Sequence, residues 1–137
     1  MPKPLPVIDV TAPVCCAPVA AAPMSSAEAI EVAVRLKALA DPTRLRLLSL
    51  LLAAPGREAC TCELAPSVGV TEATVSHHLG QLRKAGLVAN ERRGLNVWYR
   101  PVPAAIEALA DVLSVRTPRQ AGHAAAGSAA AGSAVAG

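Results

Sequence analysis

Two short helical patterns separated by a single glycine constrain the fold of this 137-residue chain more than any other feature. Residues 62–67 suit one or two helical turns, and Gly69 interrupts them. Thr71 is a favourable N-cap for a second helix, which Gly86 ends. Apolar residues recur in this second helix at positions i, i+4 and i+7, namely Val75, Leu79 and Leu82. The spacing predicts a helix-turn-helix, a motif that places its second helix in the major groove of DNA.

The polar face of this second helix carries side chains that we predict to contact DNA. It lies opposite the apolar stripe and consists largely of short polar groups, which let the helix approach base edges and phosphates closely. The predicted DNA-contacting residues of the helix are Thr71, Thr74, Ser76, His77, His78, Gln81, Arg83 and Lys84. A solvated helix face is the alternative for this pattern taken alone, because such faces are common.

A change to a strand-like period after the second helix predicts a β-hairpin. Residues 87–92 and 95–100 read as two strands around a turn at residues 93–94. From this hairpin, Arg92 and Arg93 are predicted to reach phosphates or a narrow minor groove, which would make it a basic wing. A solvated hairpin is again the alternative.

The charge of the chain is concentrated on the predicted DNA surface. The net charge of +3 would not by itself indicate a nucleic-acid partner. Residues 71–100, however, contain five basic and two acidic residues, so this segment carries the entire excess.

The helix before the central motif is predicted from its caps and its apolar spacing. Asp41 and Pro42 suit the N-cap and the first position of a helix, which Pro55 and Gly56 stop. The residues of this helix that we expect to face the core are Leu45, Leu48 and Leu52.

The first and last helices form the predicted dimer interface. Ser25 or Ser26 caps the first helix, which runs to Leu39 and is apolar over more than half of its circumference, and Pro103 opens the apolar last helix. One charged stripe of the first helix holds Glu28, Glu31 and Arg35. A core with one Trp, one Tyr and no Phe is small and suggests help from a partner chain. We therefore predict a homodimeric, mainly α domain with a small β-hairpin, a winged helix-turn-helix, over residues 25–116.

Segments of low complexity flank this domain. Residues 1–24 are rich in Pro and Ala and are predicted to be a flexible arm; prolines and an acidic residue interrupt any apolar run that would suit a signal peptide. Residues 117–137 consist mostly of Ala, Gly and Ser and are predicted to be disordered. The apolar run at residues 47–56 is too short to cross a bilayer, so we expect a cytoplasmic protein with no membrane partner.

Cys60 and Cys62 lie at the start of the short helix that opens the motif. In an extended chain their side chains point to one side, whereas on a regular helix they diverge by ~200°. We therefore expect Cys60 just before the helix, Thr61 near its N-cap and Cys62 in its first turn, where the positive helix end lowers the pKa of both thiols. Thiolates select soft or borderline ions, so we predict an ion site rather than two small buried hydrophobes. Spacing and a reducing compartment disfavour a disulfide between the two.

Cys15 and Cys16 form an adjacent pair within the N-terminal arm. The functional interpretation is a second pair of ligands that the arm brings to Cys60 and Cys62, and the alternative is a vicinal pair that oxidises or has no role. Trivalent arsenic takes three thiolates, whereas Cd(II) and Pb(II) accept three or four. Which cysteines bind, and whether one chain or two supply them, is left open by the sequence.

The order of these motifs resembles the ArsR/SmtB family of metalloregulatory repressors. The resemblance spans residues 25–115 and includes ALADPTRLRLL at residues 38–48. EACTCEL at residues 58–64 is similar to the family's sensing box, which ligates arsenic, antimony, cadmium or lead, and VSHHL at residues 75–79 is similar to its recognition-helix signature. Many members carry Lys where this chain has Gly80, which removes a phosphate contact. A vicinal cysteine pair ahead of SSAEA resembles arsenic-sensing members from high-GC bacteria.

The resemblance implies a dimeric repressor that binds a palindromic operator and is released when arsenite or antimonite binds the cysteine thiolates. A repressor that responds to Cd(II), Pb(II) or Zn(II), or a thiol redox-sensing repressor, would use the same fold. An enzyme is not expected, because a thiol reductase of arsenate needs an oxyanion cradle beside an activated cysteine, and the chain has no Cys-x5-Arg sequence.

Overall fold

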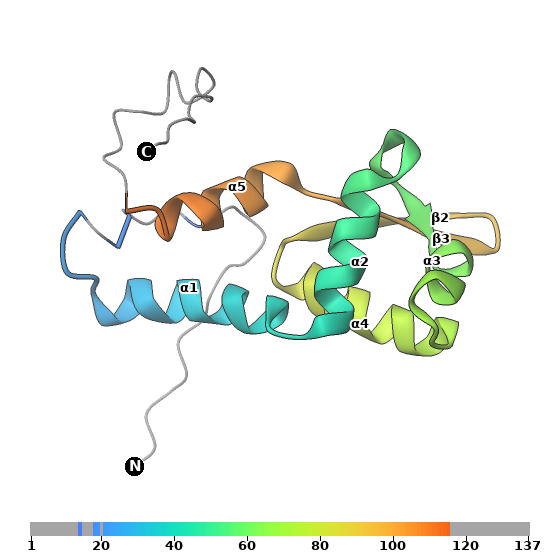
Figure 1. The fold of residues 1–137 in the computed structure, drawn as a ribbon, viewed down its shortest axis with the longest axis horizontal. Coiled ribbons are helices and arrows are strands. Elements are labelled where there is room, and N and C mark those ends of the chain that lie inside the picture. Colours follow the sequence, from blue (N-terminus) through green and yellow to red (C-terminus); the bar gives the residue numbers. More distant parts are fainter. Residues whose placement is uncertain (1–13, 15–17, 20, 116–137) are drawn as a thin grey trace, which may run out of the picture.

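The computed structural model describes Val14, residues 18–19 and residues 21–115. Five α-helices, one short 3-10 helix and three strands follow one another in this part of the chain (Figure 1). Their order is α1 (Ser26–Leu39), α2 (Pro42–Ala53), η1 (Pro55–Arg57), β1 (Ala59–Cys60), α3 (Thr61–Val68), α4 (Glu72–Lys84), β2 (Val88–Arg93), β3 (Asn96–Pro101) and α5 (Pro103–Val112). None of the described helices is long and apolar enough to cross a membrane.

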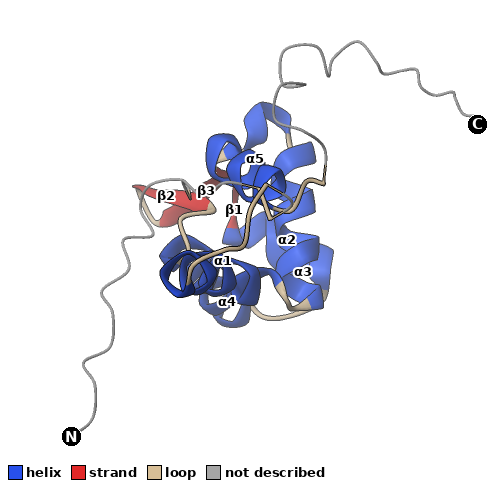
Figure 2. Ribbon diagram, turned by 90° about the vertical axis from the view of Figure 1, so that its left-hand side faces the viewer, coloured by secondary structure: helices blue, strands red, loops and turns tan. Residues whose placement is uncertain are grey.

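The elements separate into two ends of an elongated molecule. Helices α1 and α5 lie at one end, and α2, α3, α4 and the sheet lie at the other (Figure 1). The sheet is antiparallel in the order β1-β3-β2, and the β2–β3 hairpin projects to one side of the helices (Figure 2). A helix-turn-helix of α3 and α4 beside a hairpin is the predicted winged arrangement.

The helix ends are formed by the caps that the sequence predicts. The Ser25 hydroxyl accepts from the backbone N–H of Glu28, whose carboxylate accepts in return from the Ser25 N–H, a capping box. Asp41 caps α2 with Pro42 in its first turn, and Thr71 caps α4. These contacts confirm the predicted start of each helix.

Two glycines set the geometry of the central motif. Gly69 ends α3 with φ +77°, a left-handed conformation that suits glycine and turns the chain directly into α4. The hairpin pairs Arg93 with Asn96, so its turn consists of Gly94 and Leu95 rather than of residues 93–94 as predicted. The turn lies one residue later because Gly94, at φ +62°, takes the first central position of a two-residue turn, where a positive φ is required.

The core face of α2 differs from the predicted stripe. The structure buries Leu47, Leu48 and Leu51, whereas Leu45 and Leu52 are 52% and 36% exposed. The prediction is confirmed for Leu48 and wrong for Leu45 and Leu52. Leucine occupies six positions of this helix, so its apolar pattern suits several faces equally. Packing against α3, α4 and β3, which the helix's own sequence does not encode, selects the buried face.

Helix α1 buries an unexpected residue. Arg35, predicted to lie on a charged stripe, is only 3% exposed and donates from Nη1 to the backbone oxygen of Glu31 at 2.8 Å. Its neighbours on the buried face are Val32 and Ala38. Apolar side chains that remain exposed on or next to α1 and α5 are Ile30, Val34, Leu113 and Val115. This end of the molecule therefore keeps uncovered apolar surface where the sequence predicts a dimer interface.

Candidate metal centre and DNA-binding surface

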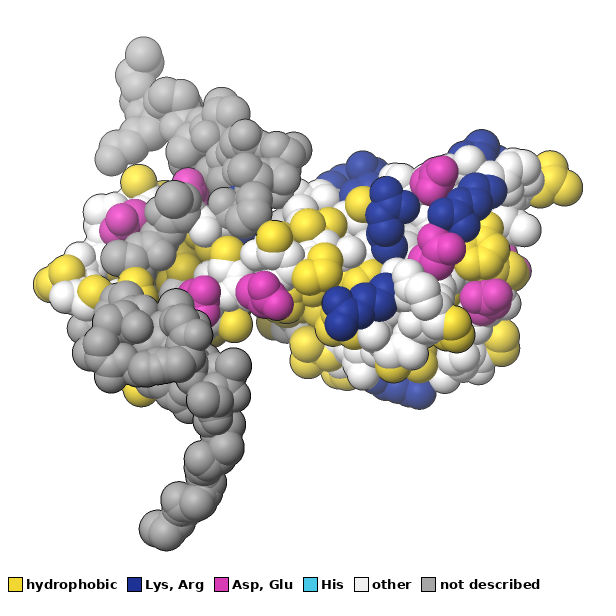
Figure 3. All heavy atoms as spheres, turned by 90° about the horizontal axis from the view of Figure 1, so that it is seen from above, with side chains coloured by type: hydrophobic (Ala, Val, Ile, Leu, Met, Phe, Trp, Pro, Cys, Tyr) yellow, Lys and Arg dark blue, Asp and Glu magenta, His cyan; other side chains and the backbone are white. Residues whose placement is uncertain are grey.

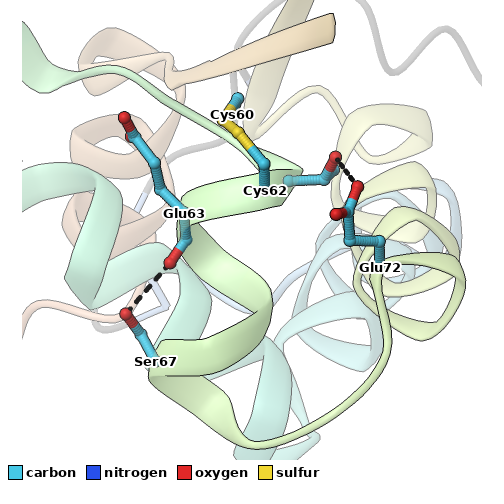
Figure 4. Close-up of a disulfide and its surroundings, with 6 residues drawn as sticks. Cys60, Cys62, Glu63, Ser67 and Glu72 are labelled. Atoms are coloured by element: carbon cyan, nitrogen blue, oxygen red, sulfur yellow. Dashed lines mark hydrogen bonds between the residues drawn. A yellow bond between two sulfur atoms is a disulfide. The ribbon is translucent and has the colours of Figure 1, made fainter.

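Cys60 and Cys62 meet where strand β1 ends and helix α3 begins (Figure 4). Cys60 is the N-cap of α3, has an extended backbone (φ −90°, ψ 165°) and is 1% exposed. Cys62 lies in the first turn and is exposed. Because an extended residue is followed directly by a helical turn, the two Cα atoms are 5.2 Å apart and the side chains converge. The predicted placement of both cysteines is therefore confirmed.

The expectation that Cys60 and Cys62 do not form a disulfide is contradicted, because the structure joins their sulfurs (Figure 4). Cys60 is the non-helical N-cap and Cys62 lies in the first turn, so the two side chains converge although only one residue separates them. The Cα separation of 5.2 Å lies within the range that disulfides adopt. Once reduced, the same pair presents two thiolates to an ion.

The described part of the chain supplies two of the four predicted sulfur ligands. Its residues contain no group of three or more His, Cys, Asp or Glu side chains arranged to hold a metal ion. Cys15 and Cys16 lie outside the described residues. Among their described neighbours, Val14 is buried in the core and the Val19 N–H donates to the Val112 oxygen of α5 at 2.8 Å.

The segment from Cys60 to Cys62 contacts both of the elements predicted to contact DNA. Cys60 pairs with Trp98 of β3, which places it directly against the hairpin. Thr61, the residue between the two cysteines, donates from Oγ1 to Oε1 of Glu72 at 3.3 Å (Figure 4). Glu72 is the first residue of α4. The sequence did not predict either contact, because each joins separate elements.

The predicted DNA-contacting face of α4 is largely open to solvent. Gln81 is half-buried, and the exposed members of the set are Thr71, Thr74, Ser76, His77, Arg83 and Lys84. The hydroxyl of Thr71 accepts from the Thr74 N–H at 3.1 Å and donates to the Thr74 hydroxyl at 2.9 Å, so capping orders both side chains. This face is accessible to a DNA groove.

His78 differs from the other predicted DNA-contacting residues. Its side chain is 17% exposed, and its Nδ1 accepts from Nε of Arg44 at 3.2 Å and lies 4.0 Å from Oδ1 of Asp41. The backbone N–H of Arg44 donates to Asp41 and is the main reason why the pKa of this carboxyl lies below its usual value. His78 thus connects the middle of α4 to the first turn of α2.

Arg93 of the predicted wing is paired with carboxylates. Its guanidinium donates to both oxygens of Glu58, at 2.7 Å and 3.1 Å, and to Glu91 at 3.0 Å, and it lies 5.1 Å from the ring centroid of Trp98. These hydrogen bonds hold the pKa values of Glu58 and Glu91 below their usual range. Figure 3 accordingly shows acidic side chains among the basic ones over the wing end of the molecule. Arg92 is exposed and has no ion pair among the described residues.

The sequence matches known regulators over the central motif. A family model described as "Bacterial regulatory protein, arsR family" matches residues 41–90, from the N-cap of α2 into β2. The arsenic resistance transcriptional regulator ArsR1 of Pseudomonas putida is 45% identical over 67 residues, which are 49% of this chain and 51% of that protein. The chain spans about half the length of the curated relatives that it matches.

Solved structures agree with the fold. The AntR antimony-specific transcriptional repressor superposes with a TM-score of 0.56 at 38% identity, over 65% of this chain and 79% of that one. A homodimeric winged helix-turn-helix DNA-binding domain from Mycobacterium bovis superposes with a TM-score of 0.53 at 31% identity, over 65% of this chain and 83% of that one. The predicted winged helix-turn-helix fold is confirmed, and the chain belongs to the arsR family of bacterial regulatory proteins.

Proposed function

We propose that this chain is a homodimeric transcriptional repressor that leaves its operator when trivalent arsenic or antimony binds Cys60 and Cys62. The observation that carries the proposal is the convergence of these two side chains at the start of α3, directly ahead of the recognition helix. Relatives named as an arsenic resistance regulator and an antimony-specific repressor support the choice of ion. The family consists of DNA-binding regulators, not of enzymes.

The chemistry of the pair suits a thiophilic ion. Thiolate ligands favour soft and borderline ions over hard ones such as Mg²⁺ or Ca²⁺. The N-terminal end of α3 carries a positive partial charge, which favours the thiolate form of a reduced cysteine there. A trigonal thiolate site needs a third sulfur, for which Cys15 and Cys16, of the same chain or of its partner, are the remaining cysteines.

The DNA-binding half of the proposal rests on α4 and the hairpin. The exposed polar face of α4 would enter a major groove, and Arg92 would reach the phosphates beside it. The uncovered apolar residues of α1 and α5 would pair two copies about a two-fold axis. Such a dimer presents two α4 helices to two half-sites, which predicts a palindromic operator.

Competition between ions and DNA tests this function. The reduced full-length protein first selects its own binding duplex from a random-sequence pool, and a mobility-shift assay then titrates the complex with arsenite, trivalent antimony, Cd(II), Pb(II) and Zn(II). We expect arsenite and antimony to release the DNA at the lowest concentrations. Release by Cd(II) or Pb(II) alone would reassign the inducer within the same mechanism, and release by none of the five ions would refute it.

A thiol redox sensor is the second candidate, and the Cys60–Cys62 disulfide favours it. Two thiols would transfer two electrons and two protons to hydrogen peroxide, giving one disulfide and two molecules of water. Disulfide sulfurs are no longer thiolates, so oxidation would also remove the ion site. If peroxide releases DNA in chelator-treated buffer and a dithiol reductant restores binding, this second function holds; equal affinity of both forms would exclude it.

A further inference from the structure

We propose that the Thr61–Glu72 hydrogen bond transmits the state of the cysteine pair to the recognition helix. The inference rests on the proposed function and adds the residues that couple its two sites. Thr61 is the residue between Cys60 and Cys62, and Glu72 is the first residue of α4 (Figure 4). The link therefore joins the ion site to the DNA-reading element through one side chain on each helix.

Thr61 is the backbone link between the two sulfur-bearing residues. It is 9% exposed, so its hydroxyl has little access to water as an alternative partner. An ion with bonds of ~2.3 Å to sulfur in tetrahedral geometry holds its thiolates ~3.8 Å apart. The covalent bond of the disulfide does not allow this separation, and two free thiols are not held to it. The backbone torsions φ and ψ of Thr61 set the separation of the Cys60 and Cys62 Cα atoms, which is 5.2 Å here. A rearrangement of the pair that changes this separation would therefore rotate the Thr61 hydroxyl.

The hydrogen bond is sensitive to a small displacement. The Thr61 Oγ1 atom lies 3.3 Å from Oε1 of Glu72, which is already long for a hydroxyl donor. A further shift of about half an ångström removes the bond. A movement as small as the one that accompanies a change in sulfur ligation is thus sufficient to break the Thr61–Glu72 hydrogen bond.

The released Glu72 carboxylate would weaken DNA binding. Glu72 follows the N-cap Thr71 and precedes Thr74, two residues of the predicted DNA-contacting face. While Thr61 donates to it, the carboxylate is held toward α3 (Figure 4). Without that donor, a mobile negative charge remains beside the predicted phosphate and base contacts, where it repels DNA. Loss of the Thr61–Glu72 hydrogen bond also removes one constraint on how α4 packs against α3.

Substitution of Thr61 tests the link without changing a sulfur. Thr61→Val replaces the hydroxyl by a methyl group of similar size, and Thr61→Ser keeps the hydroxyl. Ser67→Ala is the matched control, because it removes a hydroxyl of the same helix that bonds only to the Glu63 oxygen of α3 (Figure 4). Glu72→Ala removes the other end of the link at an exposed position and serves if Thr61→Val does not fold.

Three quantities are measured on each reduced full-length variant, whose fold is checked by circular dichroism. They are the affinity for arsenite and for Cd(II), the affinity of the ion-free protein for the selected duplex, and the ratio of duplex affinities without and with ion. We expect a ratio of about 100-fold for the unmodified chain, Thr61→Ser and Ser67→Ala, and of less than about 10-fold for Thr61→Val and Glu72→Ala. Ion affinity should change by less than about threefold, because no sulfur is altered.

The outcomes separate this inference from the proposed function. An unmodified chain whose duplex affinity does not respond to any ion refutes both. A normal response in the unmodified chain with the same ratio in Thr61→Val and Glu72→Ala refutes the link alone. Loss of ion affinity by more than tenfold in Thr61→Val also refutes it, because Thr61 would then act on the ion site itself.

Discussion

At the scale of single residues, the two arginines of the wing have different environments. Arg93 is held by Glu58 and Glu91, whereas Arg92 is exposed without an ion pair among the described residues. A guanidinium that must leave two carboxylates gains less from a phosphate than one that is surrounded by water. We therefore expect Arg92 to contribute more than Arg93 to DNA binding at the wing.

We predict that Arg92→Ala weakens binding to the selected duplex more than Arg93→Ala does. Loss of one phosphate contact should also reduce the slope of log affinity against log salt concentration by about 1 for Arg92→Ala. Fluorescence anisotropy of a labelled duplex over a series of salt concentrations measures both effects. An Arg93→Ala variant that shows the larger change in slope would overturn this assignment.

The same pairing predicts how acid affects folding. The Arg93 hydrogen bonds hold the pKa values of Glu58 and Glu91 below the value of 4.5 expected for the unfolded chain. Their contribution to the free energy of unfolding is therefore complete above pH 4.5 and is lost as the pH falls through the folded-state values. Arg93→Gln should lower stability to urea at pH 7 and differ little from the unmodified chain at pH 2. Arg92→Gln is the control, and an Arg93 effect that persists unchanged in acid would contradict the account.

Residue-level contacts were the least predictable part of the site. The position of the two cysteines at the start of α3 was predicted from the chemistry of helix ends and from their two-residue spacing. The partners of Arg93 and His78 could not be predicted in this way. Glu58 lies 35 positions from Arg93 in the chain, and Arg44 lies 34 positions from His78. Glu58 lies two residues before Cys60 in the sequence, but its pairing with Arg93 depends on how β1 lies against the hairpin.

At the scale of elements, helix ends were predictable and buried faces were not. Ser25, Asp41 and Thr71 cap helices through their own side chains, so local sequence determines where these helices start. The leucine-rich α2 offers several apolar faces, and only packing against the other elements selects one. The hairpin turn moved by one residue because Gly94 supplies the positive φ at the first turn position.

Gly80 is a test of helix propensity within α4. A Cβ atom added at this position meets nothing within 4 Å, so an alanine fits without a clash. We predict that Gly80→Ala raises the free energy of unfolding by about 1 kcal/mol, because glycine is less favourable than alanine in a helix interior. Gly69→Ala should instead destabilise by about 1 kcal/mol, since its φ is positive. Urea denaturation monitored by circular dichroism measures the free energy of unfolding of both variants. A Gly80→Ala variant less stable than the unmodified chain would show that close packing requires the glycine.

At the scale of the whole molecule, the end formed by α1 and α5 keeps large apolar side chains exposed. Ile30 and Leu113 are 40% and 48% exposed there, although both are large and apolar. Pairing of two copies over this surface would bury them and set two α4 helices on one face of the DNA.

We predict that Ile30→Asp gives a monomer by sedimentation velocity and loses most of its affinity for the selected duplex. A charge at the centre of a buried interface is costly, and a monomer contacts only one half-site. Leu95→Asp, at a 96% exposed wing position, is the matched control and should remain a dimer. An Ile30→Asp protein that sediments as a dimer would place the interface elsewhere.

In the proposed function, an ion on Cys60 and Cys62 dissociates the chain from DNA. The most direct measurement is the anisotropy of a preformed complex between the reduced protein and its selected duplex during titration with arsenite. We expect arsenite to release the duplex from the unmodified chain. At the same concentrations it should not release the duplex from Cys60→Ser or Cys62→Ser, both of which keep the affinity of the ion-free protein for DNA. If both cysteine variants release the duplex as the unmodified chain does, the inducer binds elsewhere and the account is wrong.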